Sequence, residues 1–473
     1  MKCHGDTREA GDAWKPVPLP GAAPFYLRLA DAIARDIESG RLADGARLTS
    51  QRDLAKTLRV TLGTVTRAFA EAKRRGLIAC ETGRGSYARK PAPRPMEFDV
   101  ERATDPSLFD FGPSNSLRID ALERTALRDV FAAMARRIDA IAKIRAPDFV
   151  ADDRVRGLVA PHLARIGLPF APPDDVMLVC QGAQQGIAAV FGALARPGDI
   201  VLTESLTYPG IRRLAEAMRI RLHPVRVDKH GLDPEALDAA CRKAAPKLLY
   251  CVPTLNPATA TLTPDARRRE IAQVLLRHGT WLLEDDDDSC MATVVPPLAA
   301  RVKSRACFLL DSTKLMTPGL RLAYLVVPAA LARHIRGAVQ TLSWAPAPLQ
   351  NEIGALLLEL GHSAKLVAAR RAEIANRHAI VRSTLPRSSG FRYDLPRGAH
   401  HLWLELDPLG PRLRAETAVA SAMRAGVRIV GPDAFVVPPA TQPRAVRVSL
   451  SAEADRTRFV EGLARLKAAL APH

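Results

Sequence analysis

Short apolar segments alternate with helical segments through the middle of this chain, and no other feature restricts the fold as strongly. The apolar segments are four to six residues long and lie at residues 176–179, 200–203, 247–252, 281–284, 307–310 and 323–327. Strands joined by helical crossovers pair in parallel, so the alternation predicts a mainly parallel sheet of the α/β class. From about residue 350, helical and extended segments predict a smaller α+β subdomain.

A proline-rich stretch at residues 90–95 divides the chain into two parts. The sequence has 473 residues, more than one ordinary core accommodates. Proline fits neither a helix interior nor a central strand, so we interpret residues 90–108 as a semi-rigid linker. The expected parts are a flexible tail over residues 1–20, a small domain over 21–89 and a large domain over 109–473.

Basic residues are in excess and are densest near the N-terminus. The chain has 68 lysines and arginines against 50 acidic residues, a net charge of +18. Residues 1–90 hold 17 of the basic and 10 of the acidic residues, so this fifth of the chain carries +7. This distribution favours a polyanionic partner such as double-stranded DNA. The 47% hydrophobic and 25% charged content is typical of folded soluble protein and excludes a largely disordered chain.

The cysteines predict neither a disulfide framework nor a metal site. The seven cysteines include no Cys-x-x-Cys pair, and no histidine cluster has the spacing of a zinc site. We therefore expect buried free thiols in a reducing compartment and no bound metal. There is no secretion signal and no apolar run long enough to cross a bilayer. These features predict a cytoplasmic protein without membrane contact.

The N-terminal domain has the pattern of three helices followed by a hairpin. Ser50 with Asp53 three residues later is a helix-start signal, and Gly76 is placed to end the third helix. Three helices and a glycine-turned hairpin make a winged helix-turn-helix. The expected helices are residues 25–39, a short one after Ser50 and one from Thr61 to Arg75, and the extended pieces are residues 77–80 and 86–88.

The third helix divides into an apolar and a polar face. Leu62, Val65, Phe69 and Ala72 recur at helical spacing and are expected to face inward. The other side chains at its start are short, polar or basic, which suits the major groove and its phosphates. Each of these alone is an ordinary surface residue, but together they favour DNA contact. The candidate DNA contacts are Thr61, Thr64, Thr66 and Arg67, the preceding Arg47 and Arg52, and Arg84 and Gly85 in the hairpin, where Arg84 is expected to enter the minor groove.

A lysine in the large domain lies in a segment that indicates cofactor chemistry. Lys314 is followed seven residues later by Arg321, in the sequence Pro-Gly-Leu-Arg. A lysine amine can form an imine with pyridoxal phosphate, and a nearby arginine can hold the cofactor's phosphate. The segment predicts that Lys314 is the catalytic, imine-forming lysine and that Arg321 binds the phosphate.

Other residues supply the remaining parts of such a site. Asp285 follows an apolar strand at the end where ligands bind in open α/β sheets, and an acid there can hold the pyridine nitrogen protonated. Gly182, Ala183 and Gln184 open a helix whose backbone N–H groups can take a phosphate. The further candidates are Asn256 for the ring hydroxyl, Tyr208 for stacking on the ring, and Arg447 for the carboxylate of an amino-acid effector.

These motifs carry a resemblance to known families. Residues 25–87 resemble the GntR family of bacterial regulators, in the runs at 47–55, 64–69, 76–78 and 83–87. Residues 109–473 resemble fold-type I aminotransferases, and the whole chain resembles the MocR-type subfamily of GntR transcription regulators. The resemblance implies a large domain that binds pyridoxal phosphate and senses an amino compound or the vitamin itself. It also implies a head-to-tail homodimer whose sites use residues of both subunits.

Several residues depart from the aminotransferase pattern and weaken the expected cofactor site. Asp287 and Asp288 stand where a tyrosine usually contacts the phenolic oxygen, and Asp311 replaces a serine or threonine that donates to the phosphate. A carboxylate beside a phosphate dianion weakens binding unless it is protonated or turned away. Residues 145–148 hold no tyrosine that could reach a phosphate, and the Thr-Gly that usually follows the Asn-Pro pair at Asn256 is missing.

The head departs from its family pattern too. Thr49 stands where proline is usual, and Leu62 and Gly63 replace a basic and a polar residue of the recognition helix. The usual base-reading contact is therefore altered, and the target sequence does not follow from the family.

Three functions are compatible with these motifs. The first is a DNA-binding regulator whose large domain dimerises and senses pyridoxal phosphate or an amino compound. The second is a pyridoxal-phosphate-dependent aminotransferase with a vestigial head, and the third is a cofactor-free regulator that uses its large domain only to dimerise. The acidic run 285–288 also offers oxygen ligands for a divalent cation, although consecutive strand residues alternate sides.

Overall fold

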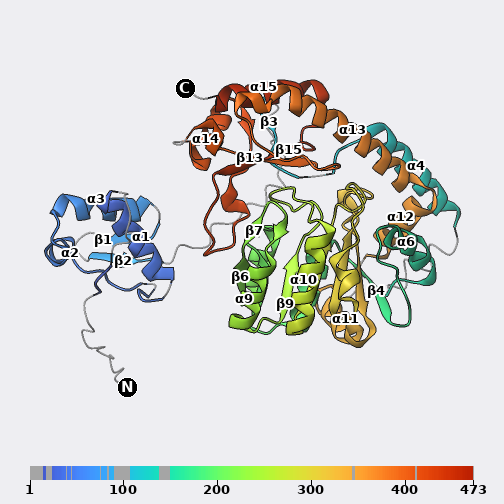
Figure 1. Ribbon diagram of the computed structural model, residues 1–473, viewed down its shortest axis with the longest axis horizontal. Coiled ribbons are helices and arrows are strands. Elements are labelled where there is room, and N and C mark those ends of the chain that lie inside the picture. The colour runs from blue at the N-terminus through green and yellow to red at the C-terminus, as the bar shows by residue number, and fades with distance from the viewer. Residues whose placement is uncertain are drawn as a thin grey trace, which may run out of the picture. The chain divides into compact units, whose positions relative to one another are not determined.

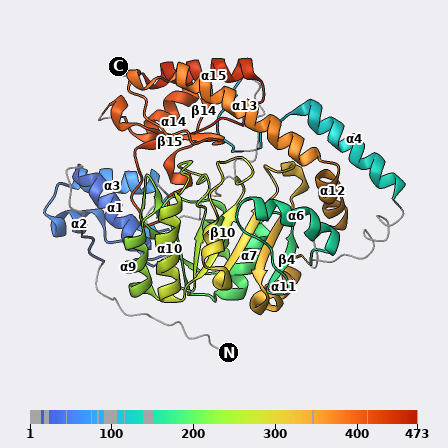
Figure 2. The same ribbon diagram turned by 45° about the vertical axis from the view of Figure 1, so that its right-hand side comes forward.

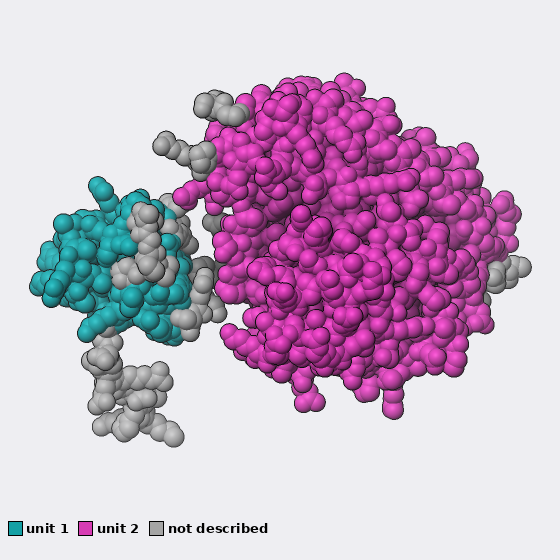
Figure 3. Space-filling model, viewed as in Figure 1, with its two compact units in different colours: residues 1–97 teal, residues 98–473 magenta. Residues whose placement is uncertain are grey.

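The computed structural model divides into two compact units, Met1–Glu97 and Phe98–His473, here called the head and the body (Figure 3). The described residues are 14–17, 24–38, 40–43, 45–74, 76–81, 85–89, 107–114, 116–137, 150–343, 347–410 and 413–471. Most of the predicted linker lies outside these residues. Residues 14–17, within the predicted tail, contact the head, because the Trp14 indole donates to Asp36 at 3.1 Å.

The head is a winged helix-turn-helix. Its helices are α1 (Phe25–Glu38), α2 (Gln51–Leu58) and α3 (Leu62–Arg74), followed by the antiparallel strands β1 (Ile78–Glu81) and β2 (Gly85–Ala88). The Ser50 hydroxyl accepts from the backbone N–H of Asp53, so the predicted start of the second helix is confirmed.

One small core holds the head together, and Leu62 lies outside it. Val65, Phe69 and Ala72 are buried as predicted, together with Ala68. The prediction for Leu62 is wrong, because this side chain is 46% exposed. Leu62 begins α3, and helical side chains lean toward the N-terminus, so its side chain extends beyond the packed part of the helix.

The body is built on a seven-stranded sheet (Figure 1). All six predicted strands lie in it, and five neighbouring strands pair in parallel. Only β12 runs antiparallel to both of its neighbours. The edge strand β6 contains Pro224, which an edge tolerates, and was not predicted. The order is β4 (Asp175–Cys180), β12 (Ala323–Pro328), β11 (Ala306–Asp311), β10 (Trp281–Asp286), β9 (Leu248–Cys251), β5 (Ile200–Glu204) and β6 (Arg221–Val225).

Helices cover both faces of this sheet, because its strands are apolar on both sides. Leu283 and its neighbours on one face pack against α7 (Ala183–Leu194), α8 (Gly210–Ala217) and α11 (Ala329–Ser343). Leu282 and its neighbours on the other face pack against α9 (Pro234–Ala244) and α10 (Asp265–His278). The loops that leave the carboxyl ends of the strands carry most of the predicted cofactor residues.

A smaller α+β subdomain completes the body, as the sequence predicts (Figure 2). It contains the antiparallel pair β13 (His401–Glu405) and β15 (Ala445–Ser449), and the parallel pair β3 (Phe109–Asp110) and β14 (Val427–Arg428). Its helices are α13 (His362–Thr384), α14 (Ala415–Arg424) and α15 (Arg456–Leu470). The remaining elements of the body are α4 (Asp120–Arg136), α6 (Asp153–Arg165), α12 (Pro348–Glu359), β7 (Val227–Asp228), β8 (Gly231–Leu232), η1 (Leu298–Arg301), η2 (Lys303–Arg305), η3 (Pro318–Leu320), η4 (Arg387–Ser389), η5 (Asp407–Leu409) and η6 (Pro432–Ala434).

The cysteines follow the prediction where their side chains are described. Cys180, Cys241, Cys251, Cys290 and Cys307 are free and buried. Among the described residues, no group of histidine, cysteine or acidic side chains could hold a metal ion. Within the same ranges, no helix has the length and hydropathy needed to cross a membrane.

Candidate functional site

Lys314 lies in the turn after β11, with its side chain buried in the body. Its Nζ donates to Asp287 Oδ2 at 2.8 Å and to the Ser114 carbonyl oxygen at 3.2 Å. Burial works to lower the pKa of Lys314, but the charges of Asp287 and Asp288 outweigh it, so the pKa is raised. The amine is therefore held as an ammonium ion at neutral pH.

Asp285 lies near the end of β10, on the strand that the sequence predicts. The Tyr250 hydroxyl donates to Asp285 Oδ2 at 2.7 Å, which fixes the carboxyl group in place. Burial raises the pKa of Asp285 well above its usual range, and the charges of Asp311 and Asp287 raise it further. The buried Asp285 carboxyl group therefore favours its protonated form more than an exposed aspartate does.

A glycine and an arginine come together at the start of α7. Gly182 has φ +76°, and a Cβ atom built there would lie 2.5 Å from Arg321 Nη2. Only glycine allows the guanidinium to approach the backbone this closely. The helix start therefore combines free backbone N–H groups of residues such as Ala183 with a cation, which suits a phosphate.

Asp311 lies at the end of β11, close to this cradle. Its Oδ1 accepts from the Thr313 backbone and hydroxyl. Burial raises the pKa of Asp311 to about 6, with the charge of Asp287 adding to the effect and that of Arg321 opposing it. A pKa of about 6 leaves most of Asp311 ionised at pH 7, so its repulsion of a phosphate weakens only as the pH falls toward 6.

Tyr208 and Gln184 meet above Gly210. The Gln184 amide donates to the Gly210 carbonyl oxygen at 3.2 Å, and a Cβ atom on Gly210 would lie 2.3 Å from the Tyr208 ring. Burial raises the pKa of Tyr208, and the charge of Asp285 adds to this while that of Arg321 opposes it. The phenol of Tyr208 therefore lies close to the Asp285 carboxyl group and to the Arg321 guanidinium.

Arg447 lies on β15, and its side chain is buried. Its guanidinium donates to the Pro257 and Gly112 carbonyl oxygens at 3.0 and 2.7 Å and lies over the Phe435 ring. Burial lowers the pKa of Arg447 to about 10, so it stays charged at neutral pH. In the described part of the chain no carboxylate forms an ion pair with it, and its Nε has no hydrogen-bond partner. An incoming carboxylate can supply the ion pair and accept a hydrogen bond from this Nε.

In the head, the predicted DNA contacts divide into capping and exposed residues. The Thr61 hydroxyl accepts from the Thr64 backbone N–H and so caps α3, and the Thr66 hydroxyl donates to Gln51 at 2.9 Å. Arg52 and Arg67 are exposed. Arg47 lies against Gly85, where φ is +119°, and a Cβ atom would lie 3.2 Å from the arginine Nε. Arg84 lies outside the described residues.

Comparison with known proteins agrees with this architecture. The family model of aminotransferases of class I and II matches residues 127–466, so the body belongs to that family. The model of bacterial regulatory proteins of the gntR family matches residues 25–87. The chain belongs to the MocR-type regulators.

The relatives of this regulator include both DNA-binding proteins and enzymes. The uncharacterized HTH-type transcriptional regulator YdeF of Bacillus subtilis is 26% identical over 96% of each chain. The pyridoxine biosynthesis regulator PdxR of Corynebacterium glutamicum is 25% identical over 78% of this chain and 81% of its own. The body also shares the fold of the α-aminoadipate aminotransferase LysN of Thermus thermophilus, with a TM-score of 0.66 and 23% identity over 77% of this chain and 92% of that one. That solved enzyme carries a phosphopyridoxyl compound.

The regulator's residues fit pyridoxal phosphate. The cradle that a Cβ atom on Gly182 would fill lies against Arg321. The charges of Asp285 and Asp287 act on Tyr208, and Asp287 is the ion-pair partner of the buried Lys314. Asn256 differs from the other predicted cofactor residues, because its amide is already hydrogen-bonded within the protein. Its Oδ1 accepts from the Ala258 and Thr259 backbones and its Nδ2 donates to the Leu206 carbonyl oxygen, so its amide holds a loop.

Two buried histidines of the regulator escaped the sequence interpretation. His400 Nδ1 lies 3.2 Å from Asp288 Oδ1, and His401 Nε2 lies 3.0 Å from the Asn256 carbonyl oxygen. Burial lowers the pKa of both histidines well below the usual value, so they are neutral. The adjacent His-His pair is the signal in the sequence that could have found them.

Proposed function

We propose that this protein is a transcription regulator whose head reads duplex DNA while its body binds pyridoxal phosphate and an amino compound. One observation carries the proposal. Lys314 pairs with Asp287. The charges of Asp287, Asp285 and Arg321 all act on Tyr208, so residues far apart in the sequence lie around one buried region of the body. An ordinary surface lysine is exposed to solvent, whereas Lys314 is buried beside carboxyl groups at the ends of strands.

Each residue has a defined part in this proposal. Lys314 would supply the amine for the cofactor's aldehyde, Asp285 would hold the pyridine nitrogen, and Arg321 with backbone N–H groups at the start of α7, such as that of Ala183, would take the phosphate. When bound, the cofactor supplies an aldehyde that recognises primary amines and a ring that withdraws electrons. Arg447 takes the carboxylate of an amino-acid effector, because its charge has no carboxylate partner in the described residues.

In this proposal the carboxyl groups around Lys314 determine how tightly the body binds pyridoxal phosphate. Attachment needs a neutral amine, so Lys314 Nζ must give up a proton and its ion pair with Asp287. Asp311 must stay protonated beside the phosphate. The site therefore favours reversible binding, which suits a sensor more than an efficient enzyme.

The DNA-binding face is proposed on the first turn of α3 and its neighbours. Arg52 and Arg67 contribute exposed positive charge, and Thr64 and the N-terminus of α3 contact phosphates. A homodimer, arranged head to tail, is proposed from the family, since two heads would read two half-sites. We propose a cytoplasmic location, because duplex DNA is found there in a bacterium.

An absorbance titration with pyridoxal phosphate tests the proposal. We expect the purified full chain to gain a saturable band in the near-visible region, and Lys314→Ala to lose it. Lys303→Ala is the matched control, since that lysine pairs with Asp175 elsewhere on the body. A featureless spectrum for the wild-type protein, or an unchanged band in Lys314→Ala, would overturn the proposed cofactor site.

A further inference from the structure

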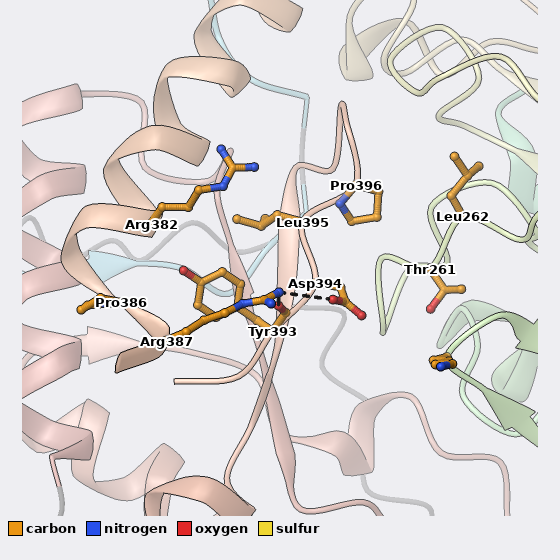
Figure 4. Close-up of a pocket in the computed structure, with 10 residues that line it drawn as sticks. Thr261, Leu262, Arg382, Pro386, Arg387, Tyr393, Asp394, Leu395 and Pro396 are labelled. Atoms are coloured by element: carbon orange, nitrogen blue, oxygen red, sulfur yellow. Dashed lines mark hydrogen bonds and ion pairs between the residues drawn. The ribbon is translucent and has the colours of Figure 1, made fainter. Parts of the chain in front are cut away.

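The body contains a second cavity, of 650 Å³, that shares no residue with the Lys314 site. One side is formed by the end of α13, η4 and residues 393–396 of the smaller subdomain. The other side is formed by Thr261, Leu262 and the β7–β8 turn of the larger one (Figure 4). Its volume lies in the range of small-molecule sites, roughly 300–1,000 Å³.

Positive charge dominates the lining of this cavity. The lining contains three cations and one carboxyl group, so it carries two net positive charges. The cations are Lys229, Arg382 and Arg387, and the carboxyl group is that of Asp394. The nearest nitrogen of Arg387 is 3.7 Å from Asp394, a loose contact between two exposed groups. Neither Lys229 nor Arg382 has an ion pair within the described ranges. Two cations are therefore available to a ligand.

The rest of the lining is apolar. Leu262, Leu395, Pro386 and Pro396 contribute aliphatic surface, and the Tyr393 ring adds an aromatic wall. The Tyr393 hydroxyl is already used, because it donates to the Leu385 carbonyl oxygen at 2.8 Å. The ring therefore offers its carbon surface to the cavity and no free polar atom.

The wall on the larger subdomain is fixed in place before any ligand binds. The Thr261 carbonyl oxygen accepts from the Asn256 backbone N–H at 3.0 Å, and the Thr261 and Thr259 hydroxyls lie 2.9 Å apart. A wall held by such bonds costs little to order on binding.

We propose that this cavity is a second ligand site, which binds a small amphipathic anion: a phosphate or carboxylate group joined to an apolar group. The anionic end lies in the field of the lining cations, with Lys229 on the wall of the larger subdomain and Arg382 and Arg387 on that of the smaller one. The apolar end packs on Leu262, Leu395 and the Tyr393 ring. The ligand thereby contacts both subdomains.

Calorimetric titration of the full chain with phenyl phosphate tests this assignment. We expect saturable binding, and we expect the double variant Lys229→Gln/Arg382→Gln to bind at least about tenfold more weakly, because two charge-assisted contacts are lost. The double variant Arg333→Gln/Arg424→Gln removes two exposed arginines on α11 and α14 outside the cavity, so it is the charge-matched control and keeps wild-type affinity. Inorganic phosphate, which lacks the apolar group, binds more weakly than phenyl phosphate.

Arg321→Gln disables the phosphate cradle of the Lys314 site, so it removes any phenyl phosphate that binds there and leaves the cavity intact. We expect Arg321→Gln to retain one saturable phenyl phosphate site, and we expect that site to weaken at least about tenfold when Lys229→Gln/Arg382→Gln is added. The assignment is wrong if the wild-type protein does not bind phenyl phosphate, if Arg321→Gln retains no binding, or if the combined variant binds as tightly as Arg321→Gln. None of these results depends on whether pyridoxal phosphate attaches to Lys314.

Discussion

The ion pair between Lys314 and Asp287 is the residue-scale feature that most affects function. A tyrosine usually lies near the lysine in this family, and the acidic run puts carboxylates there instead. In the structure the lysine's ammonium form is stabilised by a direct 2.8 Å contact. The same contact disfavours deprotonation of Lys314, and an amine must be neutral to react with an aldehyde.

Removing this ion pair should strengthen cofactor binding. In Asp287→Asn the burial of Lys314 is no longer offset by a 2.8 Å ion pair, so the pKa of the amine falls and more of it is neutral at pH 7. A fall of about one unit corresponds to roughly a tenfold lower Kd for pyridoxal phosphate. The absorbance titration measures it, with the exposed Asp153→Asn as control. An unchanged or higher Kd in Asp287→Asn would contradict the role assigned to Asp287.

At the scale of single elements, the first turn of α3 decides how the head meets DNA. The Thr61 hydroxyl is used as a cap and the Thr66 hydroxyl is bonded to Gln51. The larger exposed side chains of this region are Arg52, Arg67 and Leu62. An exposed leucine at the start of a recognition helix offers an apolar surface to a thymine methyl group. The sequence interpretation placed Leu62 in the core because spacing alone does not show where the packed surface ends.

Loss of Arg52 should weaken binding to duplex DNA in a salt-dependent way. Removing one phosphate contact in Arg52→Ala is expected to raise Kd about tenfold near 0.1 M salt and to reduce the slope of log K against log salt by about one. Fluorescence anisotropy with a labelled duplex measures both. Lys73→Ala, at the other end of α3, is the control and should behave like the wild-type protein. If both variants bind alike, the proposed reading face is misplaced.

At the scale of the whole molecule, the body buries several carboxyl groups whose pKa values burial raises. Glu204, Glu284 and Asp288 have pKa values of about 7, and Asp286 and Asp311 of about 6. Unfolded aspartate and glutamate titrate near pH 4. Between about pH 4 and 7 these five groups therefore bind more protons in the folded chain than in the unfolded chain, so their contribution to the free energy of unfolding falls as the pH rises. The buried histidines, such as His400 and His401, contribute in the opposite direction because their pKa values are lowered.

Replacing one of these groups should flatten that dependence. Asp288 faces His400, Lys314 and Asp311, and Asp288→Asn removes its titration. Because one falling contribution is removed, we expect the free energy of unfolding at pH 7.5, taken relative to its value at pH 5.5, to be higher in the variant than in the wild-type protein, by up to about 1.4 kcal/mol per pH unit. Urea unfolding at these pH values measures the difference, and Asp153→Asn should follow the wild-type curve. Parallel curves for Asp288→Asn and the wild-type protein would show that Asp288 is ionised throughout.

The sequence by itself determined the winged head, the α/β body and all six predicted strands, because local signals such as the Ser50 cap and the apolar runs report on neighbouring residues. It also picked out Lys314, Asp285, Gly182 and Arg321, since each belongs to a short motif at the end of a strand or the start of a helix. Only the tertiary structure decided what surrounds them. The pairing of Lys314 with Asp287, the His400–Asp288 contact and the basic second cavity join residues far apart in the chain, and burial and charge between such residues depend on packing that no local pattern encodes.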